Sequence, residues 1–133
     1  MKKLEVSARQ IRKESEGFFM KKSQILPNTS RLGDLQAEFD LYQMKHFPKR
    51  SSAFFALELC GEAGELANLE KKSWRDPNKT PPLKDHAFEA ADVLISLMNY
   101  CNTKGIDLSK AVLEKLEIID KKRISGQMGE SFE

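Results

Sequence analysis

Apolar side chains recur three and four residues apart along most of the chain, and no run alternates with the two-residue period of a half-buried strand. The spacing predicts four main helices, over residues 31–46, from 51 to about 73, from 82 to 104, and from 107 or 109 to about 123. A further, polar helix is expected over residues 4–22. The predicted fold class is all-α, with the four main helices packed as a bundle.

The predicted helices begin and end at residues that favour helix ends. Ser51 or Ser52 can cap the second helix by accepting a hydrogen bond from a first-turn N–H. Pro82 suits the start of the third helix, and Gly105 suits the left-handed position after its last residue. The chain is thereby divided into an N-terminal extension, one helical domain and a flexible tail, over residues 1–30, 31–124 and 125–133.

The charge of the chain is nearly balanced. Its 133 residues, enough for one domain, carry 22 Lys and Arg against 20 Asp and Glu, a formal net charge of +2. This balance gives no reason to expect binding to a nucleic-acid polymer or to a membrane surface. No apolar run is long enough to span a bilayer, and no apolar segment follows the basic residues near the N-terminus, so no secretory signal is expected.

Two cysteines fall inside the apolar helical runs. Because there is no CxxC motif and no secretory signal, Cys60 and Cys101 are expected to be buried free thiols, which is typical of a cytoplasmic protein. A disulfide between them would require the two helices to pack with these positions adjacent.

Four carboxylates interrupt the apolar surfaces of the second and third helices. Glu62 and Glu65 lie in FFALELCGEAGELANL, and Glu89 and Asp92 lie in HAFEAADVLISLMNY. The members of each pair are three residues apart, so they project from the same side of their helix. Charge at an apolar surface is unfavourable unless it is paired or binds a metal. Two such pairs facing each other predict a Mg²⁺ site, and such a site suggests chemistry on phosphates.

The neighbours of these residues extend the pattern. Glu58 lies one turn before Glu62 on the same flank, and Gly61 and Gly64 keep this part of the helix slim, so that another helix or a ligand can approach. The polar residues of the third helix share one narrow face, namely Glu89, Asp92, Ser96, Asn99 and Tyr100. If the two faces meet, four or five carboxylates surround one space and raise one another's pKa unless a cation is present.

Two alternatives to a magnesium site follow from the same residues. The carboxylates could be solvated helix faces that are balanced by Lys71, Lys72 or Lys104. A helix bundle could also bind iron through carboxylates, but such sites usually use Glu-x-x-His motifs. Neither His46 nor His86 follows a Glu by three residues, so the two matched carboxylate pairs favour Mg²⁺.

Together these motifs resemble the all-α nucleoside triphosphate pyrophosphatases of the MazG-like family. The family has Glu-x-x-Glu on one helix and Glu-x-x-Asp on the next, which LCGEAGEL and FEAADVLISL match here, and GIDLSKAVLEKLEIIDKKR resembles its following helix. The resemblance covers roughly residues 34–123. It implies Mg²⁺-dependent hydrolysis of a (deoxy)nucleoside triphosphate to monophosphate and pyrophosphate, clearing non-standard or surplus nucleotides from the nucleotide pool.

The resemblance also implies residue roles. The metal ligands for Mg²⁺, with Mn²⁺ as a substitute, would be Glu62, Glu65, Glu89 and Asp92. Glu58 would orient or deprotonate the attacking water and would join Glu62 and Glu65 as a catalytic residue. The substrate contacts would be Lys72, Trp74, Lys115, Lys122 and Arg123. Trp74 would stack on the base, although a tryptophan here could equally cover the end of its helix.

Three positions depart from the family pattern. Gly61 stands where many members have a second Glu, Ser96 where an aromatic residue is common, and Ile119 where an Asn is expected. These departures concern the base and sugar contacts more than the metal site, so the resemblance does not imply a nucleotide specificity.

Two other functions fit parts of the pattern. Phosphoribosyl-ATP pyrophosphohydrolase shares the fold and the carboxylates, but no distinct motif for its additional contacts is visible. A catalytically inactive helical dimerisation module is a non-enzymatic alternative. The intact set of four carboxylates argues against it. A homodimer or homotetramer is expected because one short chain can hardly cover the apolar helix over residues 83–104 on every side.

Overall fold

The computed structural model describes residues 31–127, and no strand occurs in this part of the chain. The elements in order are α2 (Leu32–His46), α3 (Ser52–Arg75), a short 3-10 helix η1 (Pro77–Lys79), α4 (Leu83–Lys104) and α5 (Leu108–Ile124). The prediction of an all-α fold is therefore confirmed, and the ends of the four main helices agree with prediction to within about two residues. The helix expected over residues 4–22 and most of the expected tail lie outside the described residues.

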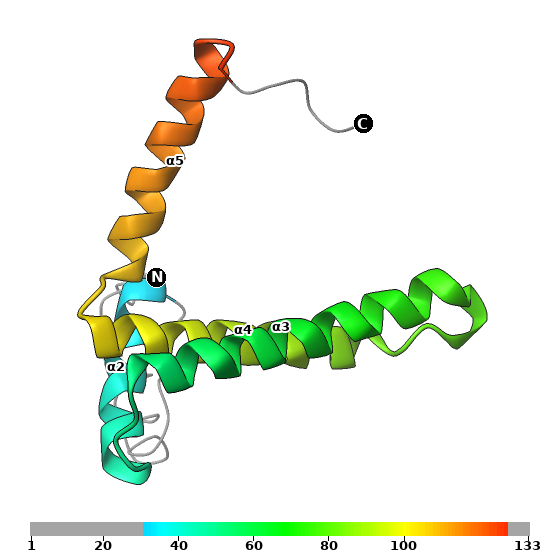
Figure 1. Cartoon of the computed structure of the whole chain (residues 1–133), viewed down its shortest axis with the longest axis horizontal. Helices are drawn as coiled ribbons and strands as arrows, with labels where there is room; N and C mark the ends of the chain where they lie inside the picture. The colour runs from blue at the N-terminus through cyan, green and yellow to red at the C-terminus, as the bar shows by residue number, and fades with distance from the viewer. Residues whose placement is uncertain (1–30, 128–133) are drawn as a thin grey trace, which may run out of the picture.

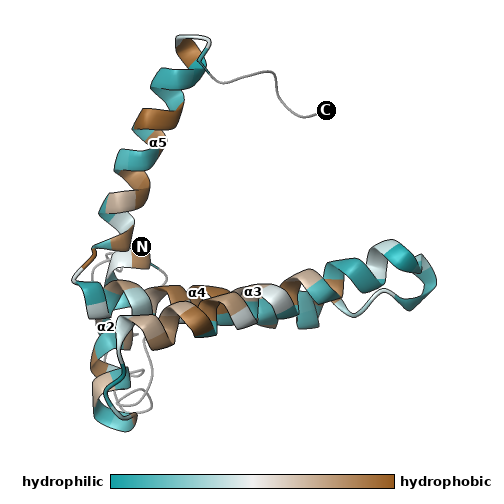
Figure 2. Ribbon diagram, in the orientation of Figure 1, coloured by the Kyte–Doolittle hydropathy of each residue, from teal (hydrophilic) through white to brown (hydrophobic). Residues whose placement is uncertain are grey.

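The two longest helices form an antiparallel hairpin. α2 packs across the end of the hairpin at which α3 begins and α4 ends, and α5 starts beside α2 and points away from the hairpin (Figure 1). Apolar residues are concentrated in the half of the hairpin near α2, whereas the connection between α3 and α4 is hydrophilic (Figure 2). The core therefore lies where α2, α3 and α4 meet.

The helix ends form as the sequence predicts. Ser51 Oγ accepts a hydrogen bond of 3.2 Å from the N–H of Phe54 at the start of α3. Gly105 ends α4 with φ of 68°, a left-handed conformation that favours glycine, and the next N–H, that of Ile106, donates to Cys101 O at 2.8 Å. Asp107 Oδ1 accepts from the N–H of Lys110 at 3.0 Å and caps α5.

The core of a single chain is small. The buried apolar residues of the described part are Phe55, Met98 and Cys101. Phe88 and Ile95 of α4 are exposed, as are most apolar residues of α5. Within residues 31–127, much of the apolar surface of α4 and α5 is thus exposed. No helix among residues 31–127 has the length and apolar character needed to cross a membrane.

The prediction that both cysteines are buried is half right. Cys101 is buried, and burial raises the pKa of its thiol. Cys60 is exposed, so that prediction is wrong. The physical reason is that Leu59 carries the apolar face of α3, and the next residue along a helix points about 100° away from it. Both thiols are free.

A buried polar network joins α2 to the turn between α4 and α5. Gln36 Nε2 donates to Asn102 Oδ1 at 2.9 Å and to Ile106 O at 2.7 Å. Gln36 Oε1 accepts from the N–H of Leu108 at 3.0 Å, and Asn102 Nδ2 donates to Gln36 O at 3.2 Å. The side chain of one buried glutamine therefore satisfies two backbone groups of the turn and fixes where α5 begins.

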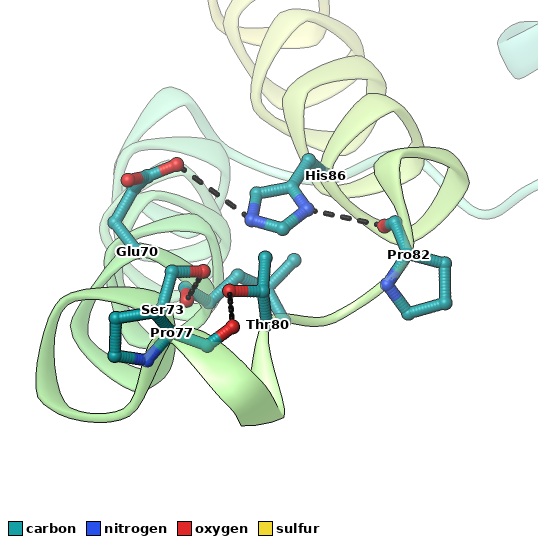
Figure 3. A network of polar contacts seen from close by, with 7 residues as sticks. Glu70, Ser73, Pro77, Thr80, Pro82 and His86 are labelled. Carbon is teal, nitrogen blue, oxygen red and sulfur yellow. Dashed lines mark hydrogen bonds and ion pairs between the residues drawn. The ribbon is translucent and has the colours of Figure 1, made fainter.

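A second set of polar contacts closes the far end of the hairpin. The imidazole of His86 on α4 lies between the two helices, with Nδ1 3.1 Å from Pro82 O and Nε2 3.6 Å from Glu70 Oε1 on α3 (Figure 3). Thr80 Oγ1 donates to Pro77 O at 2.9 Å within the connection. These contacts help to fix the register between α3 and α4, the two helices that carry the acidic residues of the candidate site.

Candidate metal centre

The acidic residues lie on the surfaces by which α3 and α4 face each other. Phe55 is buried and Leu59 and Leu66 are half-buried, which identifies the side of α3 that packs on α4. Glu62 falls on the same side and is half-buried, as is Glu89 of α4. Helix packing therefore holds two carboxylates at the edge of an apolar contact.

Three carboxylates converge across the hairpin. Glu62, Glu89 and Asp92 each offer one oxygen, and these three oxygens lie within 4.8 Å of one another. Asp92 is exposed, so the group is open to solvent on one side. The antiparallel pairing of α3 and α4 thus brings together residues of the two sequence motifs that are 27 and 30 positions apart.

The three carboxylates line an open pocket of about 560 Å³. Glu58 and Glu65 of α3 line the same pocket, so all five acidic residues singled out in the sequence border one space. Gly61 also lines it, and a Cβ at this position would meet nothing within 4 Å. Within one chain, Gly61 therefore opens room in the pocket rather than admitting a neighbouring helix.

The carboxylates of the pocket repel one another. Partial burial raises the pKa of Glu62 above its ordinary value, and the negative charges of Asp92, Glu89, Glu58 and Glu65 raise it further. Lys71, Lys72 and Lys104 form no ion pair with these residues in the described part of the chain. Glu58, Glu65 and Asp92 are exposed, as the alternative of a solvated helix face expects, but the three lysines do not balance them through ion pairs.

The donor set suits a hard divalent cation. Mg²⁺ and Mn²⁺ favour carboxylate oxygens, and an open pocket leaves room for water and phosphate oxygens beside the protein ligands. No histidine lines the pocket, and His86 is paired with Glu70 one helix turn away from Glu89. The residues present therefore fit Mg²⁺ better than a carboxylate–histidine iron centre.

The two substrate contacts expected on α3 lie beyond the pocket. Neither Lys72 nor Trp74 lines it. Trp74 is nine residues after Glu65, which is about 14 Å along a helix, and its side chain is 85% exposed. Within one chain, Trp74 neither approaches the carboxylates nor covers the end of its helix.

The three basic residues expected to contact the phosphates lie on α5. This helix points away from the hairpin, and none of Lys115, Lys122 and Arg123 lines the pocket (Figure 1). Arg123 instead forms an ion pair with Asp120, with Nη2 2.8 Å from Oδ1. A single chain therefore does not bring these residues to the carboxylates.

Sequence reasoning missed a cavity beside the pocket. Phe54 and Glu58 line both the acidic pocket and this cavity. Phe47, Arg50 and Asn99 line the cavity but not the acidic pocket. The sequence pattern singles out only Asn99 and Glu58 among these residues, and Asn99 only as part of the polar face of the third helix. A signal was present, because Asn99 is a polar residue on an apolar helix and lies two turns after Asp92, on the same face.

Comparisons with known proteins identify no relative: no family model, no curated protein and no solved structure matches this chain.

Proposed function

We propose that the protein is a Mg²⁺-dependent hydrolase that converts nucleoside triphosphates to nucleoside monophosphate and pyrophosphate and so clears unwanted nucleotides. The observation that carries this proposal is the convergence of Glu62, Glu89 and Asp92 oxygens within 4.8 Å in an open pocket. The resemblance of both acidic motifs to the MazG-like pyrophosphatases supports the choice of substrate.

The acidic residues divide into two roles under this proposal. Glu62, Glu89 and Asp92 would hold the cation, with Glu65 as a fourth ligand from the same pocket. A bound cation would neutralise the phosphate charges and lower the pKa of a nearby water molecule. Glu58 borders the pocket one turn before Glu62 and is the candidate general base.

The charge of the pocket also favours this substrate class. Five carboxylates repel a bare triphosphate, so the substrate would bind as its complex with divalent cations. A water that loses its proton to Glu58 would attack the α-phosphorus. The bond to the bridging oxygen of the β-phosphate would then break, and pyrophosphate would leave.

The active form is proposed to be a homodimer or a homotetramer. The uncovered apolar surfaces of α4 and α5 support this proposal, because a soluble chain seldom leaves so many large apolar side chains exposed. A second copy would also offer a route by which basic residues of α5 could approach a pocket on the hairpin.

The proposal is tested by incubating the protein with each canonical ribo- and deoxyribonucleoside triphosphate and Mg²⁺, and by measuring pyrophosphate and orthophosphate separately. We expect pyrophosphate, and we expect its release to stop with EDTA and to fall at least about a hundredfold in Glu62→Gln and Glu65→Gln. Glu117→Gln, an exposed position on α5, is the matched control and should keep the wild-type rate.

Other outcomes would separate the alternatives. Release of orthophosphate alone would contradict the proposed bond cleavage. No release from any nucleotide, phosphoribosyl-ATP included, would favour a helical interaction module without catalytic activity.

A further inference from the structure

A cavity adjoins the acidic pocket on the side of α2. It has a volume of about 270 Å³, and it shares Phe54 and Glu58 with the acidic pocket. It continues into a larger cavity of about 480 Å³, with which it shares Phe47, Arg50 and Asn99. Ligand pockets in proteins commonly measure about 300–1,000 Å³, so the space is large enough for a small molecule.

The walls of this cavity offer aromatic surface. The side chains of Phe47 and Phe54 are 50% and 38% exposed. The guanidinium of Arg50 lies over the ring of Phe54, 5.1 Å from its centroid. Aromatic rings and guanidinium planes are the groups on which nucleic-acid bases stack, because every base presents a flat π-face.

Asn99 supplies a hydrogen-bonding group in the wall of the cavity. The residue is only 8% exposed, yet its side-chain amide has no hydrogen-bond partner among residues 31–127. The bond of 2.8 Å that Thr103 Oγ1 donates goes to the backbone oxygen of Asn99. No side-chain polar atom in this part of the chain is both fully enclosed and unbonded, so the amide opens onto the cavity. A ligand with a matching polar edge would pair with this amide in place of the water that the open cavity admits.

The spacing along α4 links this amide to the acidic pocket. Asn99 follows Asp92 by seven residues, which is two turns and about 10 Å along the helix. One sugar separates the base of a nucleotide from its α-phosphate. A nucleotide with its phosphates at the carboxylates would therefore extend its base toward Asn99.

We propose that this cavity binds the base of the nucleotide and that Asn99 determines base specificity. This inference rests on the proposed function and extends it to the base. The amide of Asn99 presents a donor beside an acceptor, and it would pair with a base edge that offers the complementary pair, while Phe54 and Phe47 stack on the base. Bidentate amide–base pairs of this kind discriminate strongly between bases.

The test measures binding rather than turnover. Nucleoside monophosphates with each base, and ribose 5-phosphate as a probe without a base, are titrated calorimetrically into the full chain with Mg²⁺. We expect at least one nucleoside monophosphate to bind about tenfold or more tightly than ribose 5-phosphate. Asn99→Leu should reduce the preference among bases about tenfold, and Asn99→Asp, which removes the donor, should change which base is preferred.

Controls separate this inference from the proposed function. Binding of inorganic pyrophosphate with Mg²⁺ should be unchanged in Asn99→Leu, and Asn78→Leu, an exposed position in η1, should behave as wild type throughout. If Asn99→Leu does not fold, Phe54→Leu serves instead and should weaken binding of every base toward that of ribose 5-phosphate.

Base preference without hydrolysis would support the base-binding role of the cavity and contradict the proposed enzymatic activity. Equal binding of all bases and of ribose 5-phosphate, with hydrolysis intact, would overturn the role of the cavity alone.

Discussion

At the scale of single residues, Glu62 has the most unfavourable surroundings of the acidic group. It is half-buried against the apolar contact of α3 and α4 while four further carboxylates border the same pocket. Both conditions oppose its negative charge, which is why its pKa is raised. Such crowding of carboxylates is expected where a bound ligand later offsets the repulsion.

The raised pKa of Glu62 determines the sign of a pH effect on stability. The folded protein holds this proton more tightly than the unfolded chain does, so without a cation the contribution of Glu62 to stability falls as pH rises through the raised folded pKa. We therefore expect Glu62→Gln to raise the Tm of the metal-free protein at neutral pH and to leave it unchanged well below the unfolded pKa.

The measurement is thermal unfolding in EDTA across this pH range, followed by circular dichroism. Glu117→Gln is the control, and its Tm should match wild type at each pH. A Glu62→Gln variant that is less stable than wild type at neutral pH would show that the side chain makes a favourable contact instead.

At the scale of secondary-structure elements, the α2–α4 junction depends on one buried glutamine. Replacing Gln36 by Met keeps the approximate shape but removes bonds to Asn102, Ile106 and Leu108. Buried polar groups left without partners destabilise a fold by about 1–3 kcal/mol each, so we expect a total loss of about 2–5 kcal/mol. Urea unfolding measures this loss, with the exposed Lys45→Met on the same helix as control. A change below about 1 kcal/mol would indicate that water replaces the lost bonds.

The helices themselves were largely predictable from the sequence. The ends of α3 and α4 depend on local chemistry, such as the hydroxyl of Ser51 and the left-handed conformation of Gly105, and residue type reports such chemistry directly. The convergence of Glu62 with Glu89 and Asp92 was also foreseeable, because helical periodicity assigns each residue to a face.

What the sequence could not provide concerns contacts between elements. Gln36 looks like any polar residue of an amphipathic helix, and nothing local reveals that its amide satisfies a turn about 70 residues away. The same applies to the direction of α5, which depends on that junction. Phe47 and Arg50 escaped notice because their relation to Asn99 exists only once α2, α3 and α4 are packed.

At the scale of the whole molecule, α4 and α5 carry many large apolar side chains that are exposed. Val112, Leu116 and Ile119 recur on one side of α5, and all three are exposed on a helix that stands away from the hairpin (Figure 2). An amphipathic helix whose apolar side is exposed favours association with a second copy. This exposed surface is the reason for proposing a homo-oligomer.

This proposal makes a direct prediction about assembly. Sedimentation at micromolar concentration should show a dimer or a tetramer, and Leu116→Glu should shift it toward monomer because a buried charge at the interface is strongly unfavourable. Lys121→Glu, on another side of α5, is the control and should not change the sedimentation coefficient. A monomeric wild type would contradict the proposal.

The central claim is that α3 and α4 together hold a divalent cation, and calorimetric titration of the metal-free protein with Mg²⁺ tests it most directly. We predict saturable binding in the wild type that weakens at least about tenfold in both Glu62→Gln and Glu89→Gln, one ligand from each helix, while Glu117→Gln binds as wild type does. Binding that is absent in the wild type, or equally strong in all four proteins, would contradict the account.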